Sequence, residues 1–344
     1  MQNKQILFNK IPEGMPQEDT FKIEDIDTPK LESDGVLVQT LYISVDPYMR
    51  GRMTKADSYV QPFEIGKPIV SHVVAKVIDS TLADYKKGDV VVGMLPWRII
   101  NHVQADQITK VPTTDVPLDL YLSVLGMPGQ TAYHGLLDIG QPKDGDTVVV
   151  SAASGAVGSV VGQIAKIKGC RVVGIAGGDK KVNYLTETLG FDAGIDYKKE
   201  DFAESLAQAV PDGIDVYFEN VGGTVGDEVF KHLNRFARVP VCGAISSYNH
   251  PEADIGPRIQ GTLIKKQVMM RGFLVSEFAN AFKEASEQLA TWVQEGKIQS
   301  QVTIEDGFEN APRAFKNLFT GDNFGKQVIK LRNNKVYIFT NQLC

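Results

Sequence analysis

The sequence is poor in cysteine and has no long apolar runs. Its three cysteines, Cys170, Cys242 and Cys344, lie far apart along the chain. Cysteines this few and this scattered predict no disulfide framework, and we expect a reducing, cytoplasmic compartment. No apolar run approaches the roughly 20 residues that span a bilayer, and the first ten residues lack the apolar core of a signal peptide. We therefore expect no membrane segment.

An excess of basic charge is also missing. Lysine and arginine total 36 residues against 42 aspartates and glutamates, a formal net charge of −6. An acidic balance gives no general attraction to nucleic acid or to anionic membranes. We expect a small molecule as the partner, and any basic site must be local.

Metal ligands are scarce. A zinc alcohol dehydrogenase needs a catalytic Cys/His/Cys set and often four clustered structural cysteines. The five histidines show no ligand spacing, and His72, inside an apolar strand pattern, is interpreted as a satisfied strand histidine. We predict no metal site. Without a Lewis acid, hydride addition to an already polarised acceptor is favoured over alcohol dehydrogenation.

The pattern along the chain predicts two domains. The first third is β-rich, with strands expected at 36–44, 69–78 and 90–92. From about Gly126 onward, strands alternate with helices at a short period, which is typical of a doubly wound parallel sheet. The expected strands are 146–152, 171–176, 193–197, 214–219 and 238–244, and the expected helices are 157–168, 179–189, 202–209 and 225–233.

The end of the chain is expected to return to the first domain. Helices are predicted at 278–295 and 311–319, followed by a strand at 325–330. We place the first domain at 1–126, completed by about 300–344, and a nucleotide domain at 127–299. The tail 336–344 begins apolar and β-prone, which favours an added edge strand.

A glycine-containing turn follows the first strand of the predicted nucleotide domain. The segment Val149–Gly158 ends a strand and opens a helix, which is the context of a dinucleotide fingerprint. Ala153 takes the place of the first glycine, Gly155 allows close approach of the pyrophosphate, and Gly158 allows close helix–strand packing. A tight strand–helix turn without a ligand is the alternative.

The second strand of this domain indicates which cofactor binds. An NAD site usually has an acidic residue at this point, but here the strand ends in Ala176-Gly177-Gly178. Asp179 comes next, followed by Lys180 and Lys181, and cations suit a ribose 2′-phosphate. We predict NADPH, with Gly177 and Lys181 among its contacts. The alternatives are a solvated start of a helix for the lysines and a plain N-cap for Asp179.

Several longer motifs resemble one known family. They are Ser44–Gly51, Gly126–Gly129, Glu219–Gly223, Val241–Asn249 and Asn323–Lys326. Together they resemble the alkenal/one oxidoreductases, also called prostaglandin and leukotriene reductases, of the medium-chain dehydrogenase/reductase superfamily. The resemblance runs from about residue 5 to residue 331 and is greatest to bacterial NADPH-dependent curcumin reductases.

The resemblance implies a GroES-like β-rich catalytic domain, a Rossmann domain, NADPH, no metal and a homodimer. At the nicotinamide end it places Met127, Thr131, Phe273 and Val275, with Asn323 closing that end. It places Gly155, Ala156 and Val157 at the pyrophosphate and Lys181 and Tyr197 at the 2′-phosphate. The cofactor cleft is implied to contain Asn220, Cys242, Ser246 and Tyr248, and the substrate pocket Tyr48 and Tyr59. Gln130 and His134 depart from the family, which more often has apolar or aromatic residues there. We interpret His134 as a surface or packing change.

The implied reaction is reduction of a carbon–carbon double bond conjugated to a carbonyl. Tyr248 is the first candidate for the donor that stabilises the enolate, and the ribose hydroxyl of the cofactor is the second. The alternative for Tyr248 is a wall of the cleft. For Arg50 a structural ion pair is favoured over an oxyanion contact. Curcumin-like dienones, lipid-derived alkenals and oxo-prostanoid-like enones all remain open. An NADPH quinone reductase and a non-catalytic NADPH-binding protein are the rival functions.

Overall fold

The computed structural model describes residues 3–55 and 58–331, so the tail 336–344 lies outside the described residues. The chain divides into two units. The first comprises Met1–Leu122, Ile304–Leu318 and Gln327–Cys344, as far as these are described. The second comprises Ser123–Thr303 and Phe319–Lys326.

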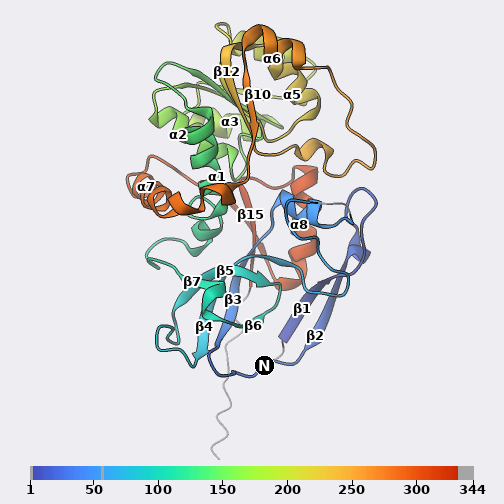
Figure 1. Ribbon diagram of the computed structural model, residues 1–344, viewed down its shortest axis with the longest axis vertical. Coiled ribbons are helices and arrows are strands. Elements are labelled where there is room, and N and C mark those ends of the chain that lie inside the picture. The colour runs from blue at the N-terminus through green and yellow to red at the C-terminus, as the bar shows by residue number, and fades with distance from the viewer. Residues whose placement is uncertain (1–2, 56–57, 332–344) are drawn as a thin grey trace, which may run out of the picture. The chain divides into compact units, whose positions relative to one another are not determined.

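The first unit is built on a seven-stranded sheet (Figure 1). Its strands are β14 (Val302–Asp306), β15 (Lys326–Lys330), β3 (Val36–Ser44), β4 (Val70–Ser80), β5 (Val90–Pro96) and β7 (Ile108–Lys110) in this order, with β6 (Ile100–Val103) beside β3. Strands β1 (Asn3–Phe8) and β2 (Phe21–Ile26) form a separate antiparallel pair. The late strand β15 pairs with β3, and Val328 lies opposite Ser44. The late strand therefore lies in the first unit's sheet, as we expected.

A buried tryptophan fixes the core of this unit. Trp97 is fully buried, and its indole N–H donates to the Ser71 hydroxyl at 2.8 Å. That hydroxyl donates in turn to the carbonyl oxygen of Ser44 at 2.7 Å. These two hydrogen bonds satisfy the buried indole N–H and connect β4 to β3 at the start of the Ser44–Gly51 motif. The helices of this unit are η1 (Glu18–Thr20), η2 (Pro47–Arg52), η3 (Ala105–Gln107), η4 (Leu118–Leu122), η9 (Phe308–Asn310) and most of α8 (Ala311–Thr320).

The second unit contains a six-stranded sheet with helices around it (Figure 1). Its strands are β10 (Ala193–Asp196), β9 (Arg171–Ala176), β8 (Thr147–Val150), β11 (Ile214–Phe218), β12 (Leu233–Val241) and β13 (Met269–Gly272), in this spatial order. Every neighbouring pair is parallel. Counted along the chain, the order is 3-2-1-4-5-6, the Rossmann arrangement. The predicted fold class, a doubly wound sheet plus a separate β-rich domain, is confirmed.

Helices connect these strands. They are α1 (Met127–His134), η5 (Gly135–Gly140), α2 (Gly158–Ile167), α3 (Asp179–Asn183), η6 (Tyr184–Thr188), α4 (Phe202–Ala209), α5 (Gly223–Phe230), η7 (Ile245–Ser247), α6 (Gln260–Lys266), η8 (Val275–Ala281) and α7 (Phe282–Gln294). The predicted helix 179–189 is thus a short α-helix continued by a wider π turn.

Several predicted boundaries were wrong: the strand expected at 90–92 runs to Pro96, and the helix expected at 225–233 ends at Phe230. We expected a helix from Phe278, but α7 begins at Phe282, and the preceding turn is the 3-10 helix η8. Within η8 the Phe278 ring stacks on His134 with centroids 4.7 Å apart. We also expected a strand only from Arg238, but β12 begins at Leu233, where it pairs with Ile214 of β11.

The return segment is divided between the units. We assigned all of 300–344 to the first domain, but Phe319–Lys326 belongs to the second unit. The Lys181 ammonium donates to the Gly321 carbonyl at 2.8 Å, the Tyr184 and Phe324 rings pack edge to face, and Gly325 forms a β-bridge with Gly155. We call Phe319–Lys326 the strap.

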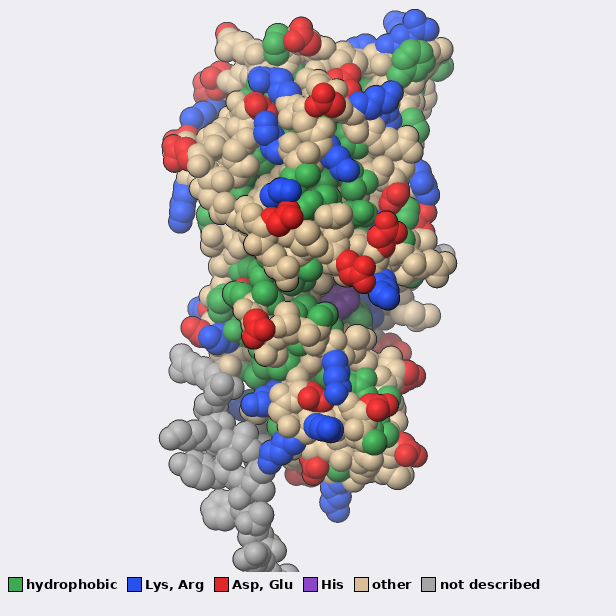
Figure 2. All heavy atoms as spheres, turned by 90° about the vertical axis from the view of Figure 1, so that its left-hand side faces the viewer, with side chains coloured by type: hydrophobic (Ala, Val, Ile, Leu, Met, Phe, Trp, Pro, Cys, Tyr) green, Lys and Arg blue, Asp and Glu red, His purple; other side chains and the backbone are tan. Residues whose placement is uncertain are grey.

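The surface carries charges of both signs. On the face drawn in Figure 2, basic and acidic side chains are interspersed rather than gathered into one stripe. Among the described residues, no helix has the length and apolar character that a membrane crossing requires.

Candidate functional site

The predicted cofactor residues of the second unit follow the carboxyl ends of its parallel strands. Strand β8 leads into the phosphate loop, β9 into Gly177, β10 into Tyr197, β11 into Asn220, β12 into Cys242 and β13 into Phe273. Carboxyl ends of parallel strands share one edge of the sheet, and ligands of open α/β sheets bind outside that edge. The order reverses between β8 and β11, so this pair forms the topological switch point.

The phosphate loop leaves backbone donors available at the start of α2. Among the described residues, the N–H groups of Val157 and Gly158 donate to no carbonyl. A helix N-terminus with such groups attracts an anion. A Cβ atom on Gly158 would lie 2.4 Å from the Ala152 carbonyl oxygen, so only glycine fits there. The loop therefore offers backbone donors to an anion, and its contact with a pyrophosphate stays a prediction.

Two cations and an aromatic ring meet at the end of β9. A Cβ atom on Gly177 would lie 2.9 Å from the Lys198 side chain and 2.9 Å from the Tyr197 ring. Burial, together with the charge of Lys198, lowers the pKa of Lys181 below its ordinary value, so the two ammonium groups lie within electrostatic reach of each other. Like charges held together in this way favour a bound anion. We call Gly177, Lys181, Tyr197 and Lys198 the cation cluster.

The acidic residues near this cluster are already engaged. Asp179 pairs with Lys199 at 2.7 Å and is not the N-cap of α3, which is Gly178. Burial alone would raise the pKa of Asp196, but backbone N–H groups of Gly178 and Lys198 lower it overall. Lys180 points elsewhere, with its ammonium 5.5 Å from the centre of the Phe324 ring. Of the two predicted lysines, only Lys181 joins the cluster.

Hydrogen bonds connect the ends of β8 and β11 at the topological switch point. The Asn220 side chain donates to the Ser151 carbonyl at 2.8 Å, and its backbone N–H donates to the Ser151 hydroxyl at 2.9 Å. That hydroxyl donates to the buried Glu219 carboxylate at 3.0 Å. The end of β8 and the end of β11 are thereby held together.

The loop after β12 packs against the same place. Ser246 donates from its backbone and its hydroxyl to the Val221 carbonyl, at 3.0 and 2.6 Å. The Tyr248 hydroxyl accepts the Ala244 N–H at 3.2 Å, which fixes where that oxygen lies. Burial raises the pKa of the Cys242 thiol to about 12, so this cysteine is a neutral group and not a nucleophile at ordinary pH.

The residues predicted at the nicotinamide lie on α1, on η8 and next to β13. Met127 is the first residue of α1, and its carbonyl accepts the Thr131 hydroxyl at 2.8 Å. The Phe273 ring is buried against Phe218, and Val275 opens η8. A Cβ on Gly135 would lie 2.5 Å from the Phe273 ring, so the end of α1 packs closely on it. Within the strap, the Asn323 side chain donates to the Gly325 carbonyl at 3.1 Å.

The two residues that depart from the family form a buried polar pair on α1. His134 is 2% exposed, and its Nδ1 lies 2.6 Å from the Asp138 carboxylate. Gln130 donates to the Phe282 carbonyl and to the Ser286 hydroxyl. Both side chains attach α1 to η8 and α7. His134 is thus a packing residue and not a surface change.

The predicted substrate residues belong to the first unit. Tyr48 is half-buried in η2, and burial together with the Asp46 charge raises the pKa of its hydroxyl, which stays protonated. Tyr59 is 63% exposed. Arg50, which we expected in an ion pair, donates to the carbonyl oxygens of Pro12 and Gly14, so its described contacts are structural.

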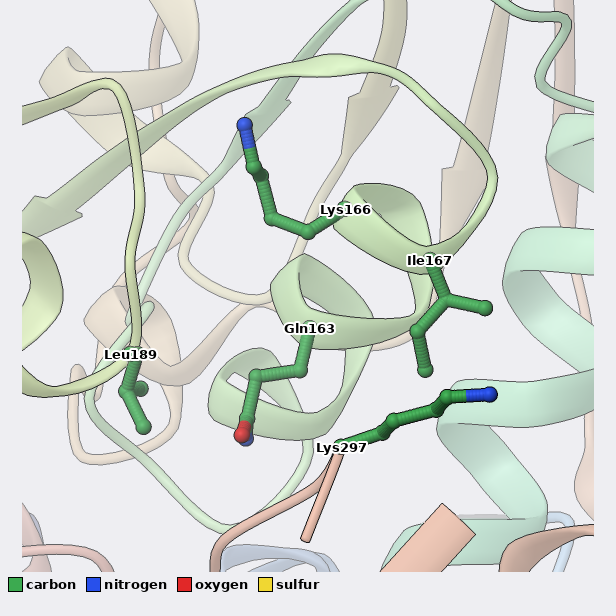
Figure 3. Close-up of a pocket in the computed structure, with 5 residues that line it drawn as sticks. All are labelled: Gln163, Lys166, Ile167, Leu189 and Lys297. Atoms are coloured by element: carbon green, nitrogen blue, oxygen red, sulfur yellow. The ribbon is translucent and has the colours of Figure 1, made fainter. Parts of the chain in front are cut away.

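A separate hollow of about 320 Å³ lies on the second unit, away from the predicted residues (Figure 3). It is lined by Gln163, Lys166, Ile167, Leu189 and Lys297. Lys166 pairs with Asp192 and Lys297 with Glu295, so their charges are already neutralised. Within the described ranges, no group of three or more histidine, cysteine, aspartate or glutamate side chains could hold a metal ion.

Sequence reasoning missed three residues of the site: Ser151, Lys198 and Glu219. Lys198 could have been found, because it directly follows Tyr197 at the end of the third strand. Ser151 and Glu219 lie inside the Val149–Gly158 and Glu219–Gly223 motifs, but their contact joins residues 68 positions apart, which no local pattern reveals.

Comparison with known proteins assigns the family. The family described as "N-terminal domain of oxidoreductase" matches residues 4–111, and the one described as "Zinc-binding dehydrogenase" matches residues 156–291. The chain is 45% identical to the NADPH-dependent curcumin reductase of Escherichia coli, over 96% of this chain and 97% of that protein. It is a member of the alkenal/one oxidoreductase family of medium-chain dehydrogenases/reductases.

Other relatives agree with this assignment. A 2-alkenal reductase (NADP(+)-dependent) of Nicotiana tabacum is 43% identical, over 95% of this chain and 97% of that protein. The crystal structure of CurA in complex with NADPH from Vibrio vulnificus superposes with a TM-score of 0.91 at 42% identity, covering 96% of this chain and 99% of that one. The predicted family resemblance is confirmed.

Proposed function

We propose that this protein is an NADPH-dependent reductase of the carbon–carbon double bond in α,β-unsaturated ketones and aldehydes. The observation that carries the cofactor assignment is the cation cluster, where the Lys198 side chain lies close to Gly177 and its charge acts on Lys181. Strand β9 ends without a carboxylate, and Asp179 beyond it is paired with Lys199. The relatives named for reduction of curcumin and of 2-alkenals support the substrate class.

The phosphate loop and the cation cluster would bind two separate anionic groups of the same ligand. The N–H groups of Val157 and Gly158 would hold the pyrophosphate, and Lys181 and Lys198 would hold the ribose 2′-phosphate. Bound NADPH supplies the hydride that adds to the β-carbon of the substrate. Met127, Thr131, Asn220, Ser246, Phe273, Val275 and Asn323 are proposed to orient its nicotinamide end, and Cys242 contributes a neutral wall.

Tyr248 is proposed as the donor at the carbonyl oxygen. As the β-carbon gains the hydride, the electron pair of the double bond moves toward this oxygen and an enolate charge develops. A hydroxyl aimed at that oxygen lowers the barrier because its hydrogen bond to the oxygen is stronger in the transition state than in the ground state. The Ala244 N–H holds the Tyr248 oxygen in place. The Tyr248 hydroxyl relays a proton from solvent to the α-carbon, which converts the enolate to the saturated carbonyl product.

Tyr48 and Tyr59 are proposed to contact the substrate. Tyr48 keeps a protonated hydroxyl on a half-buried ring, and Tyr59 offers an exposed ring. Aromatic faces of this kind suit flat, conjugated substrates such as dienones.

We also propose that the enzyme works without metal, as a homodimer, in the cytoplasm. Zinc appears in one matched family's description, but the described residues offer no ligand cluster for it. Strand β13 is an edge strand with all four residues exposed, including Met269 and Met270, and such an edge pairs readily with a second chain. The free thiols of Cys170 and Cys242 suit a reducing compartment.

A panel of enones, enals and quinones, assayed with NADPH and with NADH, tests the proposal. We expect turnover of the enones with a strong preference for NADPH. Turnover of quinones alone would favour a quinone reductase, and NADPH binding without any turnover would favour a non-catalytic role. Sedimentation of the purified protein tests the homodimer.

A further inference from the structure

Glu219 is a buried carboxylate for which the proposed reaction has no direct use. It is 4% exposed at the carboxyl end of β11, and none of the ion pairs among the described residues includes it. Burying a carboxylate without a cation is costly unless hydrogen bonds compensate. The local structure therefore has to supply donors, and the donors that it supplies come from the cofactor-binding loops.

One oxygen of this carboxylate collects three donors. Oε1 accepts the backbone N–H of Val221 at 2.8 Å, that of Gly222 at 2.9 Å and the Ser151 hydroxyl at 3.0 Å. The first two fix the turn that follows Asn220, where Gly222 and Gly223 have positive φ angles. The third hydrogen bond connects Glu219 to Ser151, the residue that follows β8 at the start of the phosphate loop.

The backbone of the same residue holds a second loop. The Glu219 carbonyl accepts the N–H groups of Cys242 and Gly243, at 2.9 and 3.2 Å. Cys242 begins the segment that continues through Ser246 to Tyr248. One residue thus joins the phosphate loop, the Asn220 turn and the Tyr248 loop, three segments that carry predicted cofactor or catalytic residues.

The surrounding structure makes room for this carboxylate. A Cβ atom on Gly226 would lie 2.6 Å from Glu219 Oε2, so α5 can pass close by only because glycine stands there. Burial, with the Glu219 charge next to it, raises the pKa of Tyr217 well above its ordinary value, so a protonated hydroxyl faces the carboxylate.

We propose that Glu219 is a positioning residue for cofactor binding and hydride transfer. Its carboxylate sets the geometry of the Asn220 turn against the phosphate loop, and its backbone carbonyl holds the Tyr248 loop beside them. This inference rests on the proposed function. It assigns Glu219 no contact with substrate or cofactor, and its effect is exerted through Asn220 and Tyr248. A buried hydrogen-bonded group used in this way fixes one arrangement of loops that could otherwise adopt several.

The reach of the side chain matters more than its charge. Glu219→Gln retains an oxygen acceptor at the same distance and loses the charge. Glu219→Asp retains the charge but is shorter by one methylene, so it cannot reach Val221 N, Gly222 N and the Ser151 hydroxyl together. The proposal expects Gln to function and Asp to fail, the opposite of what a purely electrostatic role would give.

A matched control lies on the same strand. Asp215, near the other end of β11, accepts the Thr147 N–H and the Asn234 side-chain amide, each at 2.9 Å. Asp215→Ala removes a carboxylate that also binds backbone, but at the amino end, away from the predicted cofactor residues. This variant measures how much the loss of a backbone-binding carboxylate from β11 lowers stability and activity in general.

The experiment measures NADPH dissociation constants by fluorescence, kcat and KM on one enone, and melting temperature, for the full-length variants. Because misplacing a reacting group by about 1 Å can cost roughly 100-fold, kcat/KM should fall about 10-fold to 100-fold in Glu219→Asp and Glu219→Ala. Glu219→Gln should stay within about threefold of the unmodified protein, as should Asp215→Ala, whatever its melting temperature.

Two results would overturn the proposal: unchanged NADPH affinity and kcat/KM in Glu219→Asp, or an equal loss in Asp215→Ala. If Glu219→Ala and Glu219→Asp do not fold, Ser151→Ala carries the test. This variant removes only the bridging hydroxyl and should still lower kcat/KM by about 3-fold to 10-fold, whereas an unchanged value would refute the network. Failure of the unmodified protein to bind NADPH or reduce enones would instead contradict the proposed function.

Discussion

Removing the Lys181 ammonium tests the cation cluster most sharply. Lys181→Ala should weaken NADPH binding while leaving NADH binding nearly unchanged, because only NADPH carries the 2′-phosphate. Loss of one charged hydrogen bond costs about 1.5–3 kcal/mol, and about 1.4 kcal/mol corresponds to a factor of ten. The NADPH dissociation constant should therefore rise about 10-fold to 150-fold.

Lys198→Ala should have a similar effect, since the charge of Lys198 acts on Lys181 and both belong to the cation cluster. The double variant should lose less NADPH binding free energy than the sum of the two single losses. A bound phosphate relieves the repulsion between the two lysines, and either single substitution already removes that repulsion, so the sum counts the relief twice. The assay is a fluorescence titration with each cofactor. Lys199→Ala is the control. It also removes one positive charge close to the cluster, but Lys199 pairs with the exposed Asp179 and is not part of the cation cluster.

The pH dependence gives an independent check on the same lysine. The lowered pKa of Lys181 means that its ammonium loses its proton at a lower pH than an ordinary lysine. NADPH affinity should then fall as pH rises through that lowered pKa, while NADH affinity stays level. An equal loss of both cofactors in Lys181→Ala, or a loss of NADPH affinity just as large in Lys199→Ala, would refute the reasoning.

Three further predictions concern the donor, the metal and the phosphate loop. Tyr248→Phe should lower enone turnover about 10-fold to 100-fold, with NADPH affinity nearly unchanged; unchanged turnover would make Tyr248 a wall of the cleft. Prolonged chelation should leave activity intact and elemental analysis should find no stoichiometric zinc, whereas one zinc per chain required for turnover would defeat the claim. Gly158→Ala places a Cβ 2.4 Å from the Ala152 carbonyl, so it should lower stability by about 1–3 kcal/mol and weaken NADPH binding. Gly261→Ala, with open space around it, is the matched control, and equal effects in both would argue against this packing.

Local patterns predicted much of the fold. The β-branched run Val36–Ser44 forms β3 with the predicted bounds, and Arg171–Ala176 forms β9 likewise. These runs are unambiguous because their length and composition exclude a helix. The start of α7 was predicted wrongly because Phe278 fits the helical period, yet its ring serves to stack on His134.

The site was predictable where a motif carries its own chemistry. The phosphate loop and Lys181 are of this kind, since glycine spacing and charge reveal the ligand. The strap was assigned to the wrong unit because its contact with Lys181 joins residues 140 positions apart. The motif that contains Glu219 did not reveal its role, because its contact with Ser151 forms only when β8 and β11 lie side by side.

The fate of the hydride tests the central claim most directly. A simple enone should be incubated with the protein and NADPH carrying deuterium at the transferred position, and the product analysed by NMR. We predict the saturated ketone with deuterium at the β-carbon. An allylic alcohol with deuterium at the carbonyl carbon, or no product while NADPH remains bound, would contradict double-bond reduction by this protein.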